Sequence, residues 1–100
     1  MEITLYKRNA QSKPIRWHIF PTYGNTICVQ YGSYGGIQHT EYIHCTQKDI
    51  NKEIQSMINA KRKEGYKALV DLYDNAPEYL ESGKDLYTYL NTYLPKYNTH

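Results

Sequence analysis

Cysteine is scarce in this chain of 100 residues, which contains only Cys28 and Cys45. Two cysteines without a C-x-x-C spacing indicate neither a disulfide framework nor a zinc knuckle, so we expect both to be reduced thiols. The four histidines match no zinc-binding spacing, and the neighbours His44 and Cys45 would point to opposite faces of a strand. The sequence therefore predicts no metal site and no cofactor.

Long apolar runs are also absent. No stretch of about 18 apolar residues could cross a membrane, and the N-terminus lacks the charged-then-apolar pattern of a signal peptide. We therefore expect a soluble, cytoplasmic protein without a membrane partner. A chain of 100 residues can form one modest core, with room for four or five strands and one or two helices.

No catalytic arrangement of residues can be assigned. A Cys-His pair exists in any chain that has both residues, but neither an orienting carboxylate nor an oxyanion-hole element can be placed beside one here. The Lys-x-Asp-Gly motif of nucleotidyl transfer is missing as well. We expect a protein that is not an enzyme.

Tyrosine and unevenly distributed charge are what the chain does have. Tyrosine supplies 12 of the 14 aromatic residues, and its polar tip suits a half-wet surface. Residues 1–70 carry ten Lys and Arg against five Asp and Glu, whereas residues 71–100 carry two Lys against five acids. The first part, with a net charge of +5, could face a polyanion, and the second, with −3, could not.

Alternating apolar residues predict four antiparallel strands, over 3–5, 15–20, 26–31 and 37–45. Tyr23-Gly-Asn25 predicts a tight turn between the second and third strands, because Gly and Asn tolerate positive φ. A glycine-rich and tyrosine-rich loop joins the third strand to the fourth. Trp17 shares a strand face with Ile15 and Ile19, so core packing is its expected role.

Apolar residues at helical spacing follow the strands. Thr46-x-x-Asp49 predicts a capping box, and Gly65 is placed just after the helix end. Further helices are expected over 68–73 and from Ser82 to about Tyr93, before Pro95. The sequence predicts an α+β fold: a four-stranded antiparallel sheet packed on one long amphipathic helix, followed by a short helical C-terminal tail.

Three short motifs occur in a distinctive order: Leu5-Tyr-Lys7, Tyr31-Gly-x-x-Gly35, and a Lys-x-x-x-Gly-Tyr ending at Tyr66. On these residues, positions 1–66 resemble a WGR domain, the DNA-binding module named for a Trp-Gly-Arg motif. Residues 67–100 would then be an acidic, tyrosine-rich helical tail or linker. The Tyr93-Leu-Pro-Lys96 stretch is also similar to the N-terminal accessory region of phage-type ATP-dependent DNA ligases.

The resemblance implies a module that recognises DNA ends, nicks or the phosphate backbone without sequence specificity, accessory to a DNA-processing enzyme. Tyr31-Gly32-Ser33 stands where the family has Trp-Gly-Arg, so the ring is smaller and the arginine is missing. Stacking rings, close-approach glycines and phosphate-binding cations make up the expected site. The candidates are Lys7, Arg8, Lys13, Arg16, Tyr31, Gly32, Tyr34, Gly35, Lys61, Arg62 and Lys63.

Other interpretations remain open at this point. The glycines could serve only the geometry of a hairpin turn, and Lys61-Arg-Lys63 could simply complement the dipole of a helix end. A rival hypothesis makes the chain a protein-interaction or adaptor module that docks on a replication or repair partner through residues 67–100. The sequence does not choose between duplex, nick, single strand and RNA as the ligand.

Overall fold

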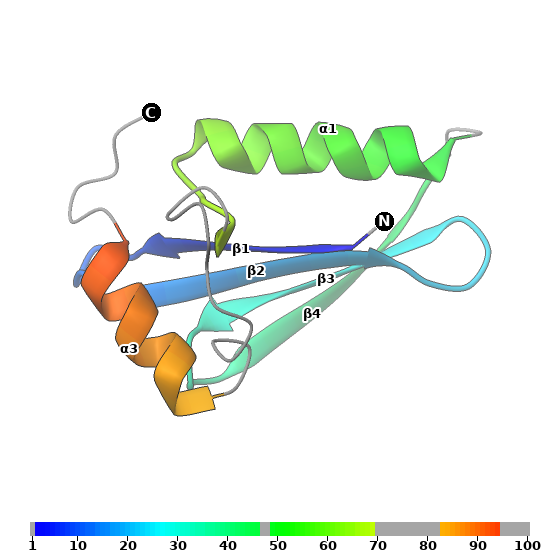
Figure 1. The fold of residues 1–100 in the computed structure, drawn as a ribbon. Coiled ribbons are helices and arrows are strands. Elements are labelled where there is room, and N and C mark those ends of the chain that lie inside the picture. Colours follow the sequence, from blue (N-terminus) through cyan, green and yellow to red (C-terminus); the bar gives the residue numbers. More distant parts are fainter. Residues whose placement is uncertain (1, 47–48, 70–82, 95–100) are drawn as a thin grey trace.

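The computed structural model describes residues 2–46, 49–69 and 83–94. They form one antiparallel sheet of four strands in the order β1-β2-β3-β4, with two helices, α1 (Ile50–Lys63) and α3 (Gly83–Tyr93) (Figure 1). The strands are β1 (Ile3–Arg8), β2 (Pro14–Pro21), β3 (Thr26–Ser33) and β4 (Gln38–His44). Neighbours in sequence are neighbours in the sheet, as expected for strands joined by hairpins. The expected α+β class and antiparallel sheet are therefore present.

The strand register explains why the sheet has two different faces. Leu5 lies opposite Trp17, and Trp17 lies opposite Tyr31, so these side chains share one face. The intervening residues, such as Tyr6 and Arg16, point to the other face. Figure 1 shows α1 over the first face, which we call the α1 face, while α3 packs on the second, the α3 face.

The main core fills the space between the sheet and α1 (Ile50–Lys63). Its buried members are Leu5, Trp17, Ile19, Ile27, Val29, Cys45, Ile54, Ile58 and Ala68. Each buried Leu, Ile or Val side chain contributes roughly 1.5–3 kcal/mol to folding. Trp17 is only 3% exposed, which confirms its expected place in the core.

The ends of α1 follow from two residues. Asp49 is the N-cap: its side chain accepts hydrogen bonds from the backbone N–H groups of Asn51 and Lys52. At the other end Gly65 has φ +102°, and the N–H groups of Gly65 and Tyr66 donate to the carbonyls of Arg62 and Lys61. This is the pattern of a Schellman motif, so Gly65 stands where the sequence predicts it.

A second, smaller core lies on the α3 face. Helix α3 (Gly83–Tyr93) buries Leu86, Tyr89 and Leu90, followed by Leu94, against Tyr6 of β1. The segment expected to be a tail therefore covers part of the sheet.

Arg8 connects β1 to the end of α3 although it is charged and only 5% exposed. Its guanidinium donates to the carbonyl oxygens of Leu94 at 3.2 Å, Asn91 at 2.7 Å and Ser12 at 2.8 Å. A weaker contact of 3.4 Å reaches the Asn91 side chain. One side chain therefore satisfies carbonyls at the C-terminal end of α3, where cations also complement the helix dipole.

The prediction of one long helix bracing the sheet, with a helical tail beyond it, is wrong. Helix α1 has 14 residues and α3 has 11, so two short helices share the cover of the sheet. The physical reason is that both faces of the sheet carry apolar side chains. A single amphipathic helix can cover only one of them, and Tyr6 needs a second element.

Smaller expectations are also corrected. The helix cap is Asp49 and not Thr46, so the predicted capping box does not form. β1 extends to Arg8, past the expected break at Lys7, because Lys7 and Arg8 still pair with Ile15 and Pro14. The expected cap at Ser82, the stop at Pro95 and most of the helix over 68–73 lie outside the described residues.

We expect Arg8→Met to lower the free energy of unfolding by about 2–4 kcal/mol, because it leaves one buried and two part-buried carbonyls without a charged donor while the apolar stem is kept. Urea unfolding followed by circular dichroism measures this. Lys13→Met is the matched control, since Lys13 is exposed and should change stability by about 0.5 kcal/mol or less. Equal unfolding midpoints for the two variants would contradict a structural role for Arg8.

Candidate nucleic-acid interface

The glycine-rich hairpin between β3 and β4 begins with a tight turn over residues 33–36. The N–H of Gly36 donates to the carbonyl of Ser33 at 2.9 Å, and Gly35 has φ +81°. Positive φ at the third position of a four-residue turn is the requirement of a type II turn. Gly35 therefore has a conformational reason to be glycine.

Gly32 has a different reason, because it lies within β3 and not in the turn. It pairs with Arg16 on one side and Gln38 on the other. A Cβ atom at this position would overlap the carbonyl oxygen of Ile37. The hairpin strands can approach this closely only because residue 32 lacks a side chain.

Tyr31 and Tyr34, the two candidate stacking tyrosines, lie on different sides of the sheet. Tyr31 is on the α1 face, 37% exposed, and its ring stacks on that of His39 with centroids 5.4 Å apart. Tyr34 is half-buried beside the small core of the α3 face, and its ring lies 5.8 Å from that of Tyr87. Only Tyr31 presents a ring toward the end of α1.

Two lysines and the rings of Trp17 and Tyr66 lie around the end of α1, and Tyr31 lines a hollow with Lys61 and both of these rings. The Nζ of Lys61 lies 5.8 Å from the ring centre of Trp17 and 5.5 Å from that of Tyr66. The Nζ of Lys7 lies 5.3 Å from the Tyr66 ring and donates to the carbonyl of Glu64 at 2.8 Å. These distances are typical of cation–π contacts. The Schellman turn of α1 places Tyr66 and the Glu64 carbonyl where Lys7 can reach both.

Tyr31 and Tyr66 line two shallow hollows of the α1 face. One, of about 430 Å³, also includes Trp17, Met57 and Lys61. The other, of about 440 Å³, extends along the hairpin past Gly32 to His39. We call Lys7, Tyr31, His39, Lys61 and Tyr66 together the Tyr31 surface. It combines the exposed rings of Tyr31 and His39 and the half-buried ring of Tyr66 with two ammonium groups, and it lies where the α1 helix ends.

Among the residues that the structure describes, the acidic side chains of this region are Glu41 and Glu64. Glu41 lines the hollow that contains Lys61, and Glu64 forms a 3.5 Å ion pair with Lys61. Arg62 and Lys63 are exposed in the last turn of α1. Within the described part of the chain, four cations, Lys7, Lys61, Arg62 and Lys63, therefore stand against two carboxylates.

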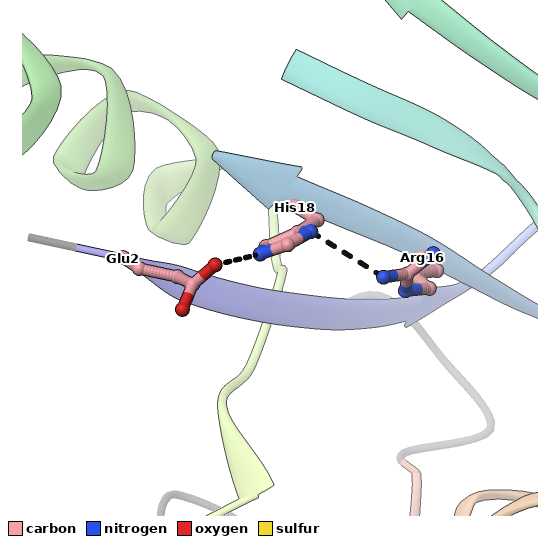
Figure 2. Close-up of polar contacts among 3 residues, drawn as sticks. All are labelled: Glu2, Arg16 and His18. Atoms are coloured by element: carbon pink, nitrogen blue, oxygen red, sulfur yellow. Dashed lines mark hydrogen bonds and ion pairs between the residues drawn. The ribbon is translucent and has the colours of Figure 1, made fainter. Parts of the chain in front are cut away.

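Arg16 lies on the α3 face and belongs to a polar chain drawn in Figure 2. Its Nη2 donates to Nδ1 of His18 at 3.4 Å, and Nε2 of His18 lies 3.0 Å from the Glu2 carboxylate. A guanidinium can only donate, so Nδ1 accepts and the ring proton on Nε2 goes to Glu2. Arg16 nevertheless borders the hollow beside Gly32 and so stays near the Tyr31 surface.

The remaining predicted cations are separated from this surface. Arg8 is buried against α3, as described above, and its donors serve backbone carbonyls. Lys13 is exposed in the turn between β1 and β2, where Asn9 accepts its backbone N–H. The structure therefore places Tyr31 and Lys61 at one hollow, with Lys7 at the neighbouring Tyr66 ring. Gly32 and Arg16 line the adjoining hollow, and Arg62 and Lys63 follow Lys61 in the last turn of α1. Arg8, Lys13, Tyr34 and Gly35 lie elsewhere, Gly35 in a hollow that it shares with Tyr34.

The sequence motifs predicted neither His39 nor Tyr66 as a residue of the site. The signal for His39 was the turn, because a hairpin centred on Gly35 places residue 39 opposite residue 31. Tyr66 belonged to the recognised Gly-Tyr ending but was not assigned to the site. Within residues 2–46, 49–69 and 83–94, no three His, Cys, Asp or Glu side chains gather as a metal site. No helix in this part of the chain is long and apolar enough to cross a membrane.

Helix α3 bears on the rival hypothesis of a partner-binding segment. Its apolar residues, including Leu90 and Leu94, are buried against the chain itself, while Tyr87 and Tyr93 are exposed at 36% and 52%. A partner that binds the described part of this segment would meet those outer tyrosines. Deleting residues 67–100 would also uncover Tyr6 and Arg8, so single surface substitutions test the hypothesis better.

Comparisons with protein-family models, curated proteins and solved structures found no match to this chain. The resemblance to the WGR domain and to ligase accessory regions therefore stays a prediction from the residues quoted above.

We expect Gly32→Ala to lower the free energy of unfolding by about 1–3 kcal/mol, because the added methyl forces the Ile37 backbone to move. Gly36→Ala is the control, since its Cβ would lie 3.2 Å from the Ser33 Cβ and need a smaller adjustment. Urea unfolding of both variants measures the difference. A Gly32→Ala protein as stable as the wild type would mean that the glycine is not required by the hairpin.

The ionisation of Tyr66 should make the stability of the protein depend on pH in the alkaline range. Burial, with a smaller effect of the nearby Glu64 carboxylate, raises the pKa of Tyr66 above its ordinary value of 10.0. Because the folded state holds the phenol proton more tightly than the unfolded state, the contribution is complete below pH 10.0 and is lost as pH rises through the folded pKa.

Above pH 10.0 the free energy of unfolding of the wild type should therefore fall relative to that of Tyr66→Phe. Below pH 10.0 the difference between the two proteins should stay constant. Chemical unfolding between about pH 9 and pH 11.5 compares them. Tyr23→Phe, at a ring that is 93% exposed, is the control. Parallel curves for wild type and Tyr66→Phe over the whole range would contradict the raised pKa.

Proposed function

We propose that this chain is a non-catalytic nucleic-acid-binding module that holds an exposed DNA end or nick on the Tyr31 surface without reading its sequence. The observation that carries the proposal is the Tyr31–His39 stack, with centroids 5.4 Å apart, beside hollows that also contain Lys61 and Tyr66. Rings and ammonium groups in one place suit a ligand that is both flat and anionic.

Stacking supplies the part of the binding that depends on an end. A base inside a duplex offers no free face, whereas a terminal or nicked base does. Tyr31 is exposed, and the planes of its ring and the His39 ring meet at 29°. A base could therefore stack on Tyr31 as a third ring. Such a contact contributes roughly 1–3 kcal/mol per base and tolerates any base, because every base has a π-face.

Phosphate contacts supply the part of the DNA affinity that depends on salt concentration. Lys7 and Lys61 border the rings, and Arg62 and Lys63 extend the positive charge along the last turn of α1. Each neutralised phosphate releases counterions, so affinity should fall steeply as salt rises. A phosphate would compete with the Glu64 carbonyl for Lys7 and with the Glu64 carboxylate for Lys61. Both are weak competitors, because the carbonyl is uncharged and the ion pair is exposed.

The WGR resemblance agrees with this proposal in the place of the ring. Tyr31 occupies the position of the motif tryptophan, and the missing motif arginine has Ser33 in its place. On the proposed surface, Lys61 and Lys7 provide positive charge from neighbouring elements. As an accessory module, the chain would bring a DNA-processing enzyme to an end or nick.

We expect Tyr31→Ala to weaken binding to an open DNA end by about tenfold or more, because it removes the stacking face. Fluorescence anisotropy measures the affinity for three labelled duplexes: blunt with a 5′-phosphate, nicked, and closed at both ends by hairpins. Each is titrated at about 50 and 200 mM salt to separate the phosphate contribution.

Tyr23→Ala is the matched control, since this tyrosine is 93% exposed in the turn at the opposite end of β3. It should bind as the wild type does. Tyr34 is left intact, because its contacts with α3 would confuse affinity with stability. Equal affinity for open and closed duplexes, or equal affinity of the Tyr31→Ala and Tyr23→Ala variants, would contradict end recognition.

A further inference from the structure

β4 is an edge strand that the described chain leaves open. It pairs with β3 on one side, and in the residues the structure describes no strand lies on its other side. Every residue of β4 except Ile43 is exposed, and Ile37 and Tyr42 are 82% and 71% exposed. Its outer backbone N–H and C=O groups are therefore available to another strand.

The opposite edge of the sheet is protected differently. β1 is bridged by Lys67, whose backbone exchanges two hydrogen bonds of 2.8 Å with Tyr6. It also carries Lys7 and Arg8. The sequence of β4, Gln38-His-Thr-Glu-Tyr-Ile-His44, contains neither lysine nor proline, the residues that most often prevent strands from pairing at an edge.

We propose that β4 pairs antiparallel with β4 of a second copy of this chain, which makes one continuous eight-stranded sheet across a two-fold axis. In such a dimer, directly opposite residues must lie on the same face of the sheet. Only registers centred on a residue satisfy this condition. The choice is therefore among a few centres, of which Thr40, Glu41 and Tyr42 allow the longest overlap.

The register centred on Thr40 is self-complementary. His39 of one copy then faces Glu41 of the other, and the two-fold axis makes this pair twice. Gln38 faces Tyr42 on the other side of the sheet. Extending the pairing by one residue sets Ile37 against Ile43, which covers the most exposed apolar side chain of this edge.

The neighbouring registers are worse for identifiable reasons. Centring on Glu41 puts the two Glu41 carboxylates directly opposite each other, and like charges in that position are destabilising. Centring on Tyr42 sets Glu41 against Ile43 and leaves Ile37 without a partner. Charge and apolar pairing therefore both favour Thr40 as the centre.

Two measurements test this dimer. Sedimentation equilibrium of the full chain should show a monomer–dimer equilibrium, and Thr40→Lys should weaken it by about fivefold or more, since it places two ammonium groups opposite each other at the axis. Thr46→Lys is the control: it adds the same charge at an exposed residue just beyond β4 and should leave the equilibrium unchanged.

Disulfide trapping tests the register. Opposite residues in an antiparallel pair have Cα atoms about 4.5–5.5 Å apart, within reach of a disulfide. Oxidised Thr40→Cys should therefore form a covalent dimer, whereas Glu41→Cys should not, because its copies are offset along the strands. The wild type controls for Cys28 and Cys45, which are both buried.

A monomer at every concentration would overturn the proposal, as would a dimer that Thr40→Lys does not weaken. Efficient cross-linking through Glu41→Cys, or none through Thr40→Cys, would overturn the register. A monomer whose β4 amides become protected only when an extended peptide is added would show that another chain takes the place assigned here to a second copy. None of these results depends on DNA binding.

Discussion

The buried guanidinium of Arg8 is the interaction on which much of the arrangement depends. It lies at the end of β1 and reaches carbonyls at the C-terminal end of α3 and in the turn after β1. A charge that is 5% exposed is costly unless all its donors are used, and here each of its three nitrogens has an acceptor. Arg8 thereby fixes α3 against the sheet from the side opposite α1.

The tyrosines on the two faces of the sheet have different surroundings. On the α1 face the apolar contact ends before the last turn of the helix, so Tyr31, Tyr66 and the lysines border hollows instead of a closed core. On the α3 face, Tyr6 and Tyr34 have neighbours from α3 and become part of a small core. Tyrosine suits both settings, which explains how a chain with one phenylalanine builds two cores and a wet aromatic surface.

Local patterns predicted much of the sheet and the end of α1. Period-two alternation identified all four strands, and Gly65 marked the helix end because no other residue adopts its conformation at so low a cost. Long-range packing was not predictable in the same way. Nothing in the sequence around Arg8 distinguishes a buried clamp from a surface cation, and only the placement of Leu94 and Asn91, more than 80 residues away, decides between them.

In the candidate site, too, local motifs indicated some residues, whereas the packing of others could not be predicted from the sequence. Of the residues that the motifs indicated, Tyr31 and Lys61 line one hollow and Lys7 lies at the Tyr66 ring, whereas Tyr34, the other candidate tyrosine, lies on the α3 face. Since adjacent strand residues point to opposite faces and a turn intervenes, residues three apart across Ser33 need not share a side. The register supplied the partner that the motif did not, because His39 lies directly opposite Tyr31.

The proposed binding of an exposed nucleic-acid end to the Tyr31 surface can be tested residue by residue. The most direct test is a titration of the isotopically labelled chain with a 5′-phosphorylated blunt duplex, followed by amide and aromatic chemical shifts in nuclear magnetic resonance. If the Tyr31 surface holds the DNA end, the shifts of Tyr31, His39, Lys61 and Tyr66 change together and saturate, while those of Tyr23 and Tyr42 stay constant. Changes confined to other parts of the chain, or no change at low salt, would contradict this proposal.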